Sequence, residues 1–321
     1  MNATNLARCS GALLALALCA ACGAGATVEP SNAAARVGLS PLLHYPTNVP
    51  DLLRKPRTFE YIINFYGSYA SIFDYPESSK QIGTINNVGG QGCTNVLHGY
   101  GKKTFWIVAG QNQITEYRVP HEPIKTLSSP PGSAPSSCAM NGSGDLAVGI
   151  LSGTGRGDLV VYKNASGSGT VYTTPLTGGE YFDGYDDHGN LFADGFTGRF
   201  YGFRLIELPK GSTKFKVITP SNIISFPGSV QWDGNYLTIL DQNASKIYQY
   251  TVGGTKATLK GTVSLEGSAD CAQTWIVKGI VYCADNANGD GEVFKYPAGG
   301  SAVAVFTGNF DFPLGVVAVA K

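Results

Sequence analysis

The sequence predicts an all-β fold of repeated antiparallel sheets, and three observations support this prediction. Glycine accounts for 42 of the 321 residues, and charged residues make up 14%, against about 25% in typical soluble proteins. Short segments rich in Val, Ile, Tyr and Phe alternate with turns that contain Gly, Asn and Asp, as strands and hairpins require. These segments recur at a nearly constant spacing over the second part of the chain.

The composition also limits the classes of function. Lys and Arg number 23, Asp and Glu number 23, and the formal net charge is zero. A protein that binds nucleic acid through its phosphates needs a basic surface, so we expect no nucleic-acid partner. Hydrophobic residues make up 43% of the chain, which is enough for a large core and argues against a disordered chain.

Residues 1–22 predict a signal peptide. Arg8 is the one charged residue among the first 28, and the apolar run Gly11–Ala21 is shorter than the ~20 residues that span a membrane. Two cleavage sites compete. Cys19-Ala20-Ala21-Cys22-Gly23 is similar to a bacterial lipoprotein box, which predicts lipidation of Cys22. Cleavage after Ala24-Gly25-Ala26 would instead secrete the protein.

Residues 23–57 predict a flexible tether. This segment contains Pro30, Pro41, Pro46, Pro50 and Pro56. Such a linker would hold the folded part of the chain away from the membrane. We therefore expect an exported protein of the cell envelope, attached to the membrane by lipid on Cys22 alone, or else a secreted protein.

Six repeats of four strands account for residues 58–321. The second strands of the repeats end at Asn64, Gly110, Ile150, Asp194, Asp241 and Asp285, at spacings of 40–47 residues. The third strands are expected at 71–75, 114–117, 159–162, 203–206, 247–250 and 293–296, and the fourth at 81–85, 124–127, 170–173, 215–218, 257–259 and 303–306. Four strands in each unit of ~40–50 residues are typical of a β-propeller, so we predict six four-stranded antiparallel blades.

The two ends of the repeat region predict how the ring closes. The first repeat begins at about Phe59 with its second strand and lacks an inner strand, whereas Phe312–Val319 is an inner strand without a blade. This segment matches Phe226–Trp232, the predicted inner strand of the fifth repeat. The C-terminal strand is therefore expected to complete blade one, which would remove the exposed edges of an open sheet. A β-sandwich and a β-helix were the alternatives, and neither accounts for six copies of this length.

Three motifs carry a resemblance to a known superfamily. They are Gly189-Asn190-Leu191-Phe192-Ala193-Asp194-Gly195, Phe226-Pro227-Gly228 with Gln231-Trp232-Asp233-Gly234, and Lys295-Tyr296-Pro297-Ala298-Gly299-Gly300. The chain resembles six-bladed propellers of the NHL-repeat and streptogramin-lyase-like superfamily, and within it a branch of bacterial envelope lipoproteins of unassigned function. The resemblance implies the fold over residues 58–321. It selects no activity, because such propellers include lyases, lactonases and binding modules.

Four cysteines lie in the repeat region, and three pairings of them are open. We favour Cys93–Cys138, because these residues are 45 apart and so one repeat apart, and Cys271–Cys283, which face each other across a predicted hairpin. Four buried thiols are the alternative. The absence of any Cys-x-x-Cys or His-x-x-x-His spacing in the sequence argues against zinc.

Five aspartates are candidates for binding a ligand. Asp183 and Asp270 are expected at the starts of inner strands, near the pore, and Asp194, Asp241 and Asp285 end second strands on the same face. Together with backbone oxygens such carboxylates could hold Ca²⁺, although no cofactor is otherwise expected. In the alternative interpretation they cap loops by accepting backbone N–H groups.

Three aromatic residues complete the set of candidate ligand-binding residues. Trp232 and Trp275 are 43 residues apart, so we expect them at equivalent positions, and Tyr185 is expected at a strand start or in a loop. Aromatic rings beside Asp would suit a sugar or a peptide. Packing between blades is the alternative role of both tryptophans.

Two classes of function remain open. The first is a monomeric, lipid-anchored binding or scaffold propeller for an envelope protein, a peptide or a glycan. The second is a metal-dependent hydrolase or lyase, lactonase-like or streptogramin-lyase-like, with its site at the pore mouth. The resemblance to the lyase would require a catalytic histidine beside the central pocket, and the sequence places none of His44, His98, His121 and His188 there.

Overall fold

The computed structural model describes residues 57–95, 103–109, 113–151, 157–198 and 201–321, which belong to one compact unit, Arg57–Lys321. The predicted signal peptide with Cys22, residues 23–56 of the predicted tether, and His98 lie outside the described residues. Within the described ranges, no helix has the length and apolar character needed to cross a membrane.

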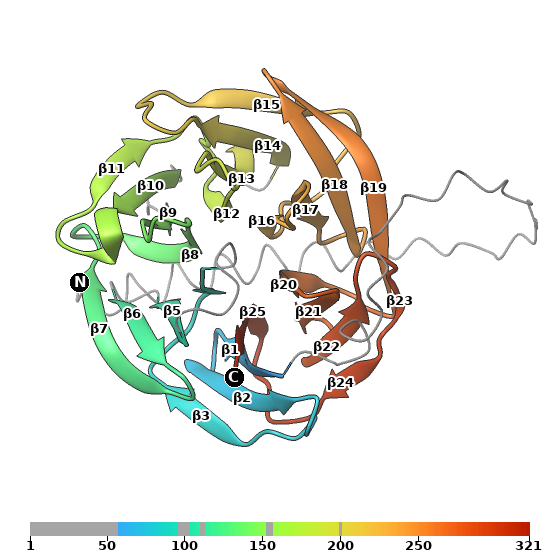
Figure 1. The fold of residues 1–321 in the computed structure, drawn as a ribbon. Coiled ribbons are helices and arrows are strands. Elements are labelled where there is room, and N and C mark those ends of the chain that lie inside the picture. Colours follow the sequence, from blue (N-terminus) through green and yellow to red (C-terminus); the bar gives the residue numbers. More distant parts are fainter. Residues whose placement is uncertain (1–56, 96–102, 110–112, 152–156, 199–200) are drawn as a thin grey trace, which may run out of the picture. The chain divides into compact units, whose positions relative to one another are not determined.

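Strands form nearly all of the regular structure (Figure 1). One 3₁₀ turn, η1 (Lys163–Ala165), is the single helical element of the described residues. The first sheet contains β1 (Thr58–Asn64), β2 (Tyr69–Tyr75), β3 (Gly83–Asn86) and β25 (Pro313–Ala320). The second contains β4 (Gly92–Cys93), β5 (Thr104–Ala109), β6 (Gln113–Arg118) and β7 (Glu122–Ser128).

Two further sheets have the same four-stranded antiparallel order. One contains β8 (Ala134–Met140), β9 (Leu146–Leu151), β10 (Gly157–Tyr162) and β11 (Thr170–Thr173). The other contains β20 (Cys271–Val277), β21 (Ile280–Asp285), β22 (Asp290–Lys295) and β24 (Ala304–Phe306). The prediction of an all-β fold with four-stranded antiparallel units is confirmed.

The remaining strands form one nine-stranded sheet, where the sequence predicts two separate ones. Its first run is β12 (Glu180–Tyr185), β13 (Leu191–Gly198), β14 (Tyr201–Leu208) and β15 (Lys216–Pro220). Its second run is β16 (Val230–Trp232), β17 (Leu237–Asp241), β18 (Lys246–Gly253) and β19 (Lys256–Glu266), and β23 (Gly300–Ser301) pairs with β19. The runs join because the outer strands β15 and β19 pair in parallel over two residue pairs, Thr219 with Lys256 and Pro220 with Ala257.

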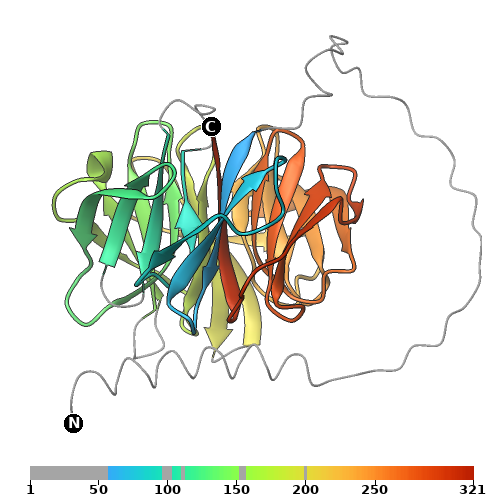
Figure 2. The same cartoon turned by 90° about the horizontal axis from the view of Figure 1, so that it is seen from below.

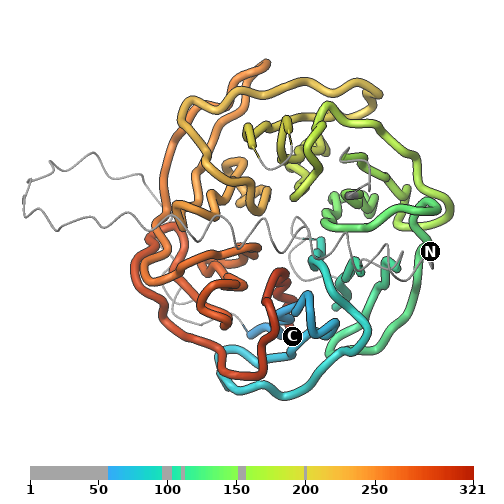
Figure 3. Tube along the Cα trace, turned by 180° about the vertical axis from the view of Figure 1, so that it is seen from behind, coloured from blue at the N-terminus to red at the C-terminus, as the bar shows by residue number. Residues whose placement is uncertain are grey.

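The sheets stand around a common axis like the blades of a propeller (Figure 1). Strands β4, β8, β12, β16, β20 and β25 lie nearest this axis, and we call them the inner strands. The predicted pairing of the two chain ends is present, because β25 runs antiparallel to β1 from Thr58 opposite Ala320 to Ile63 opposite Gly315. Figures 2 and 3 show these strands side by side, although they come from opposite ends of the described chain.

Glutamine side chains fasten neighbouring inner strands to one another. Gln231 on β16 accepts the backbone N–H of Ile276 at 2.8 Å and donates to the carbonyl of the same residue at 2.8 Å. Gln273 on β20 accepts the N–H of Val316 at 2.8 Å and donates to the carbonyl of Gly92 at 3.1 Å. Each of these amides thus satisfies backbone groups of another sheet, which fixes the inner strands relative to one another.

Two disulfides add covalent links near the axis. Cys93 on β4 is joined to Cys138 on β8, with Cα atoms 5.7 Å apart. Cys271 and Cys283 join the adjacent strands β20 and β21, with Cα atoms 5.6 Å apart. These are the pairings that the repeat spacing favours, and all four residues are buried.

The closing strand supplies the first prediction. Val316 on β25 is fully buried in the large core between the sheets, whereas Val305 on the outer strand β24 is 42% exposed. A charge buried without a partner costs several kcal/mol, and a domain of this size loses about 2–4 °C of melting temperature for each kcal/mol. We expect Val316→Asp to lower the melting temperature by about 10 °C or more, or to prevent folding. Val305→Asp should change it by about 2 °C or less. Thermal unfolding followed by circular dichroism checks both, and equal effects would contradict the importance of ring closure.

Candidate functional site

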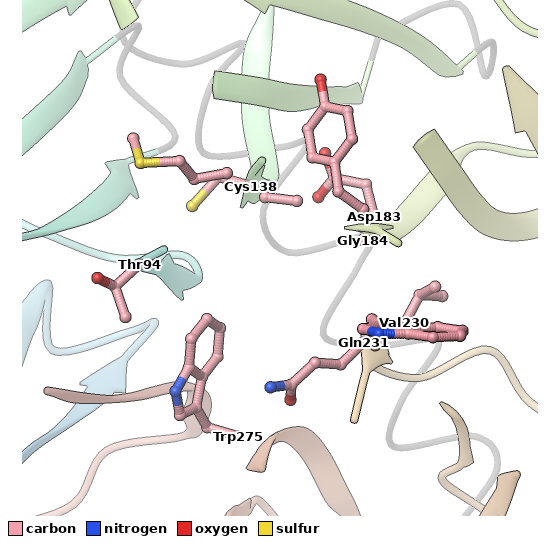
Figure 4. A pocket seen from close by; sticks show the side chains of 11 residues that line it. Thr94, Cys138, Asp183, Gly184, Val230, Gln231 and Trp275 are labelled. Carbon is pink, nitrogen blue, oxygen red and sulfur yellow. The ribbon is translucent and has the colours of Figure 1, made fainter. Parts of the chain in front are cut away.

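The ends of five inner strands surround a pocket near the axis (Figure 4). Its walls include Thr94, which follows β4, together with Met140 on β8, Asp183 and Tyr185 on β12, Gln231 and Trp232 on β16, and Trp275 on β20. We call this the axial pocket. Its cavity volume is about 20 Å³, which is enough for about one water-sized group.

The structure brings four of the predicted ligand-binding residues together in this pocket and leaves four elsewhere. Asp183, Tyr185, Trp232 and Trp275 line it. Asp194, which lies opposite Phe182, does not line the pocket, and neither do Asp241, Asp270 and Asp285. The predicted set is therefore only partly brought together.

A turn that is repeated after three inner strands positions the pocket residues. Met140, Tyr185 and Trp232 each end an inner strand and are each followed by Asn or Asp. The Oδ1 atom of that next residue accepts two backbone N–H groups of the hairpin at 2.7–3.0 Å, in Asn141, Asp186 and Asp233 alike. Such side-chain turns fix where the hairpin reverses, and so they fix where the preceding side chain stands.

Asp183 is the buried acid of the pocket. It lies within β12, opposite Ala193, and not at the start of an inner strand as the sequence suggested. Its side chain is 6% exposed, and neither carboxyl oxygen has a hydrogen-bond partner among the described residues. In Figure 4 it lies across the pocket from Trp275. A buried acceptor without a partner is unusual in a folded protein, so this carboxyl is the first candidate for contact with a ligand.

Two inner strands approach each other closely beside the pocket. A Cβ atom on Gly184, the residue after Asp183, would come within 2.2 Å of the Val230 carbonyl oxygen. Glycine is thus required for β12 and β16 to pack this closely.

Burial determines the charge of this carboxyl. It raises the pKa of Asp183 to about 8, and the nearby Ser137 hydroxyl offsets a small part of this effect. Burial, followed by the charge of Asp183, raises the pKa of Glu180 well above its usual range, and burial does the same to Asp194. Three buried carboxyls this close cannot all be ionised, so Asp183 is largely neutral at pH 7.

The sequence analysis missed Glu180, which supports Asp183 from the start of the same strand. Glu180 is fully buried and accepts the hydroxyls of Ser137 at 2.8 Å and Ser136 at 3.2 Å. The Ser137 hydroxyl also lies near Asp183, where its hydrogen bonding lowers the pKa of that carboxyl. No local motif distinguishes Glu180, since its role depends on serines from another sheet.

The two tryptophans of the pocket are not at equivalent positions, which corrects the prediction from their spacing. Trp232 is opposite Leu237, four residues before Asp241, whereas Trp275 is opposite Tyr282, three residues before Asp285. A shift of one residue turns a side chain to the other face of a sheet. Trp275 accordingly belongs to the core and Trp232 is half-buried. The indole N–H of each lacks a partner among the described residues.

Asp241 and Asp285 cap loops, as the alternative interpretation of these residues proposed. Asp241 accepts the N–H of Ser225 at 2.8 Å and its hydroxyl at 2.7 Å. Asp285 accepts the N–H of Ala269 and the hydroxyl of Ser268, both at 2.7 Å. Each thereby fixes the loop that enters the inner strand of its own sheet.

The other two carboxyls also bind within the protein. Asp194 accepts the N–H of Gly228 at 3.2 Å, and Asp270 accepts the side-chain amide of Asn286 at 3.2 Å. Neither lines the axial pocket. The four aspartates outside the pocket thus recur at repeat positions because they bind groups of the protein itself. They do not form one ligand site.

Two groups in the described part of the chain are close enough to hold a metal ion. They are Asp186, Asp187 and His188 in the hairpin after β12, and Cys283, Asp285 and Glu292 in the sheet of β20–β24. Neither contains two of the predicted carboxyls. The sulfur of Cys283 is in a disulfide, and Asp285 already accepts several hydrogen bonds, so the second group is poorly suited to Ca²⁺, which takes 6–8 oxygen ligands.

Thr94, Met140 and Gln231 are pocket residues that the sequence analysis did not single out. A signal for Met140 was available, because Met140-Asn141 repeats the pattern of Tyr185-Asp186 and Trp232-Asp233. Thr94 and Gln231 have no such signal, since they reach the pocket through the arrangement of the sheets.

Comparison with known proteins supports the fold. No protein-family model matches the sequence, and no curated protein matches it. A Bacteroides caccae protein of unknown function is similar in structure with a TM-score of 0.62 and 10% identity, over 83% of this chain and 100% of that chain. A chain of a nidogen/laminin complex is similar in structure with a TM-score of 0.64 and 12% identity, over 82% of this chain and 98% of that chain.

A structure of streptogramin B lyase is also similar, with a TM-score of 0.45 and 14% identity, over 65% of this chain and 66% of that chain. This TM-score is too low to carry an argument about activity. At 10% and 12% identity, the first two similarities bear on the fold alone. Together with the sheets described above, they support a β-propeller.

The raised pKa of Asp183 gives the second prediction. The folded protein holds this proton up to about pH 8, whereas the unfolded chain releases it near pH 4. The folded state therefore loses stability as pH rises between these values. Asp183→Asn removes the cost of ionisation, so its effect on the melting temperature should be more favourable at pH 9 than at pH 5. The three pH units between pH 5 and about pH 8 correspond to about 4 kcal/mol, or roughly 10 °C of melting temperature. Melting curves at both pH values check this.

Asp187→Asn is the matched control. Asp187 lies in the hairpin after β12, and its side chain is 47% exposed. The substitution should change the melting temperature by about 1 °C or less at either pH. If Asp183→Asn changes the melting temperature equally at pH 5 and pH 9, Asp183 is ionised throughout this range.

Proposed function

We propose that this protein is a binding module that holds a protein, peptide or glycan ligand at the axial pocket. The observation that carries this proposal is the carboxyl of Asp183, which is buried, lacks a partner among the described residues, and lines a pocket with Trp232 and Trp275. An unsatisfied buried polar group costs about 1–3 kcal/mol. A ligand that donates to it recovers this free energy as affinity.

The rigidity of the pocket supports a binding role. Both amide atoms of Gln231 are engaged by Ile276, and the Cys93–Cys138 disulfide lies in the wall that Cys138 contributes. A pocket formed in advance loses little conformational entropy when it binds. Met140 adds a flexible side chain that can adapt to the bound group.

A metal-dependent hydrolase or lyase is the alternative, and the pocket supports it less well. An enzyme of this kind needs several titratable groups that converge on one reacting atom. Among the described residues, the pocket walls contain one carboxyl and no histidine. Both groups of potential metal ligands lie outside its walls.

We infer that the ring has six blades. The two antiparallel runs of the nine-stranded sheet join over two residue pairs, so each is counted as a blade beside the four separate sheets. The NHL-repeat and streptogramin-lyase-like superfamily, and its branch of envelope lipoproteins, remain the assignment that the sequence motifs favour. The similarity to solved structures supports the propeller fold that this assignment implies.

We further propose that the protein is exported and attached to the membrane through a lipid on Cys22, with residues 23–57 as the tether. The lipoprotein-like motif supports this proposal. So do the two disulfides, because such bonds persist in oxidising compartments outside the cytosol. The protein would act as a monomer without a nucleic-acid partner, and its ligand would be found in the envelope.

Lipidation gives the third prediction. When the chain is expressed in bacteria with a radioactive fatty acid, the full-length protein should carry label and appear in the membrane fraction. Cys22→Ala should lose the label completely, whereas the control Cys19→Ala should keep it. Label that persists in Cys22→Ala would rule out the proposed anchor.

Binding at the axial pocket gives the fourth prediction. The chain has three tryptophans. Trp106 is buried in the core, so a ligand at the pocket should change the fluorescence of the other two. We expect any probe that binds, tested among short peptides and soluble oligosaccharides, to lose tenfold or more of its affinity in Trp232→Ala. Ile223→Ala is the control, because Ile223 is 87% exposed and precedes β16 at the opposite end. A probe that binds both variants equally well binds elsewhere.

A further inference from the structure

The size of the axial pocket limits what can enter it. A volume of about 20 Å³ holds one group the size of a water molecule, and not a whole sugar ring or an amino-acid side chain of ordinary size. The bound ligand must therefore insert one small protruding group and rest on the rim. The rim is formed by half-buried residues, Thr94, Met140 and Trp232.

The polar atoms without partners define the chemistry of the inserted group. Asp183 supplies two oxygen atoms, and Trp232 and Trp275 supply one N–H donor each. The inserted group must be able to donate to the carboxyl and to accept from an indole. A hydroxyl group can do both, whereas an ammonium group can donate but not accept.

The charges around the pocket argue further for a neutral ligand. Asp183 lies near two other buried carboxyls, Glu180 and Asp194, and a carboxylate or a phosphate would find no cationic partner beside them. The described residues that line the pocket include no lysine or arginine. Binding of a neutral ligand also requires no change in the protonation of the three carboxyls.

The rim suits the body of a saccharide. The half-buried indole of Trp232 offers an apolar surface beside polar atoms, and aromatic rings of this kind combine contact area with a hydrogen-bonding edge. Figure 4 shows Trp275 and Asp183 on facing sides of the opening, with the indole nitrogen of Trp275 turned toward Thr94. A sugar that covers this opening could direct one hydroxyl group between the two sides.

We propose that the axial pocket recognises a neutral saccharide by taking one of its hydroxyl groups between the carboxyl of Asp183 and the indole N–H group of Trp232. This proposal rests on the proposed function, since it names the ligand class of the same site. The hydroxyl donates its hydrogen to Asp183 and accepts from an indole. The sugar ring lies on Trp232 at the rim.

The experiment uses the folded protein and named probes. Chitotriose, maltotriose and cellotriose are titrated by calorimetry, with trilysine and trialanine as peptide probes. We expect at least one trisaccharide to bind and both peptides to fail. For the sugar that binds, monodeoxy analogues should reveal one position at which loss of the hydroxyl weakens affinity tenfold or more.

Four variants test the assigned contacts. Trp232→Phe keeps the ring and removes the N–H, so it should weaken the sugar several-fold, and Trp232→Ala should weaken it further. Asp183→Leu, which removes both oxygen atoms, should weaken it about tenfold, whereas Asp183→Asn, which keeps a neutral acceptor, should weaken it less. Ile223→Ala should leave the affinity unchanged. A deoxy series without a sensitive position, or a sugar that binds all variants equally, overturns the proposal.

The outcomes separate this proposal from the broader one. If a peptide binds with the same dependence on Trp232 and Asp183 and no sugar does, the saccharide assignment fails and the binding function stands. If neither sugars nor peptides show affinity that depends on these residues, both fail.

Discussion

The antiparallel pairing of β1 with β25 is the interaction on which the rest of this structure depends. It joins residues about 250 positions apart in the sequence, from Thr58 opposite Ala320 onward. The entropy of closing such a long loop grows slowly with length, so the buried valines of β25 can outweigh it. Closure also gives Gln273 its partner, the N–H of Val316, and in this way links the last sheet to the first. A ring without β25 would leave an edge of β1 exposed.

Closure of the ring fixes the positions of the inner strands, and the ends of these strands form the axial pocket. Inner strands held by Gln231, Gln273 and two disulfides cannot relax around a side chain that lacks partners. This constraint explains how Asp183 stays buried without a hydrogen bond, and why burial raises its pKa so far. The free-energy cost of burying this carboxyl without a partner arises at one residue, and the packing of the whole ring offsets it. A pocket of this kind stores binding free energy that a suitable ligand can recover.

The strands and the closure could be predicted from the sequence because they follow from periodic patterns. Alternating apolar residues, regular turns and an inner strand without a blade all recur along the chain. The contents of the site could not be predicted in the same way. Asp183 lies within its strand because β12 begins three residues earlier, at Glu180, and Trp232 and Trp275 differ in register because their hairpins differ in length. When the pairing of two strands shifts by one residue, the spacing of the repeats in the sequence stays the same. The side chain, however, turns to the other face of the sheet.

The most direct test of this account is the titration of Asp183 itself, followed by the NMR signal of its carboxyl carbon between pH 3 and pH 10. The account predicts a midpoint near pH 8, because the closed ring buries this carboxyl beside two others and gives it no hydrogen-bond partner among the described residues. A midpoint near pH 4, the ordinary value for an exposed aspartate, would mean that the carboxyl is solvated or paired. That result would contradict the buried site on which the proposed function is built.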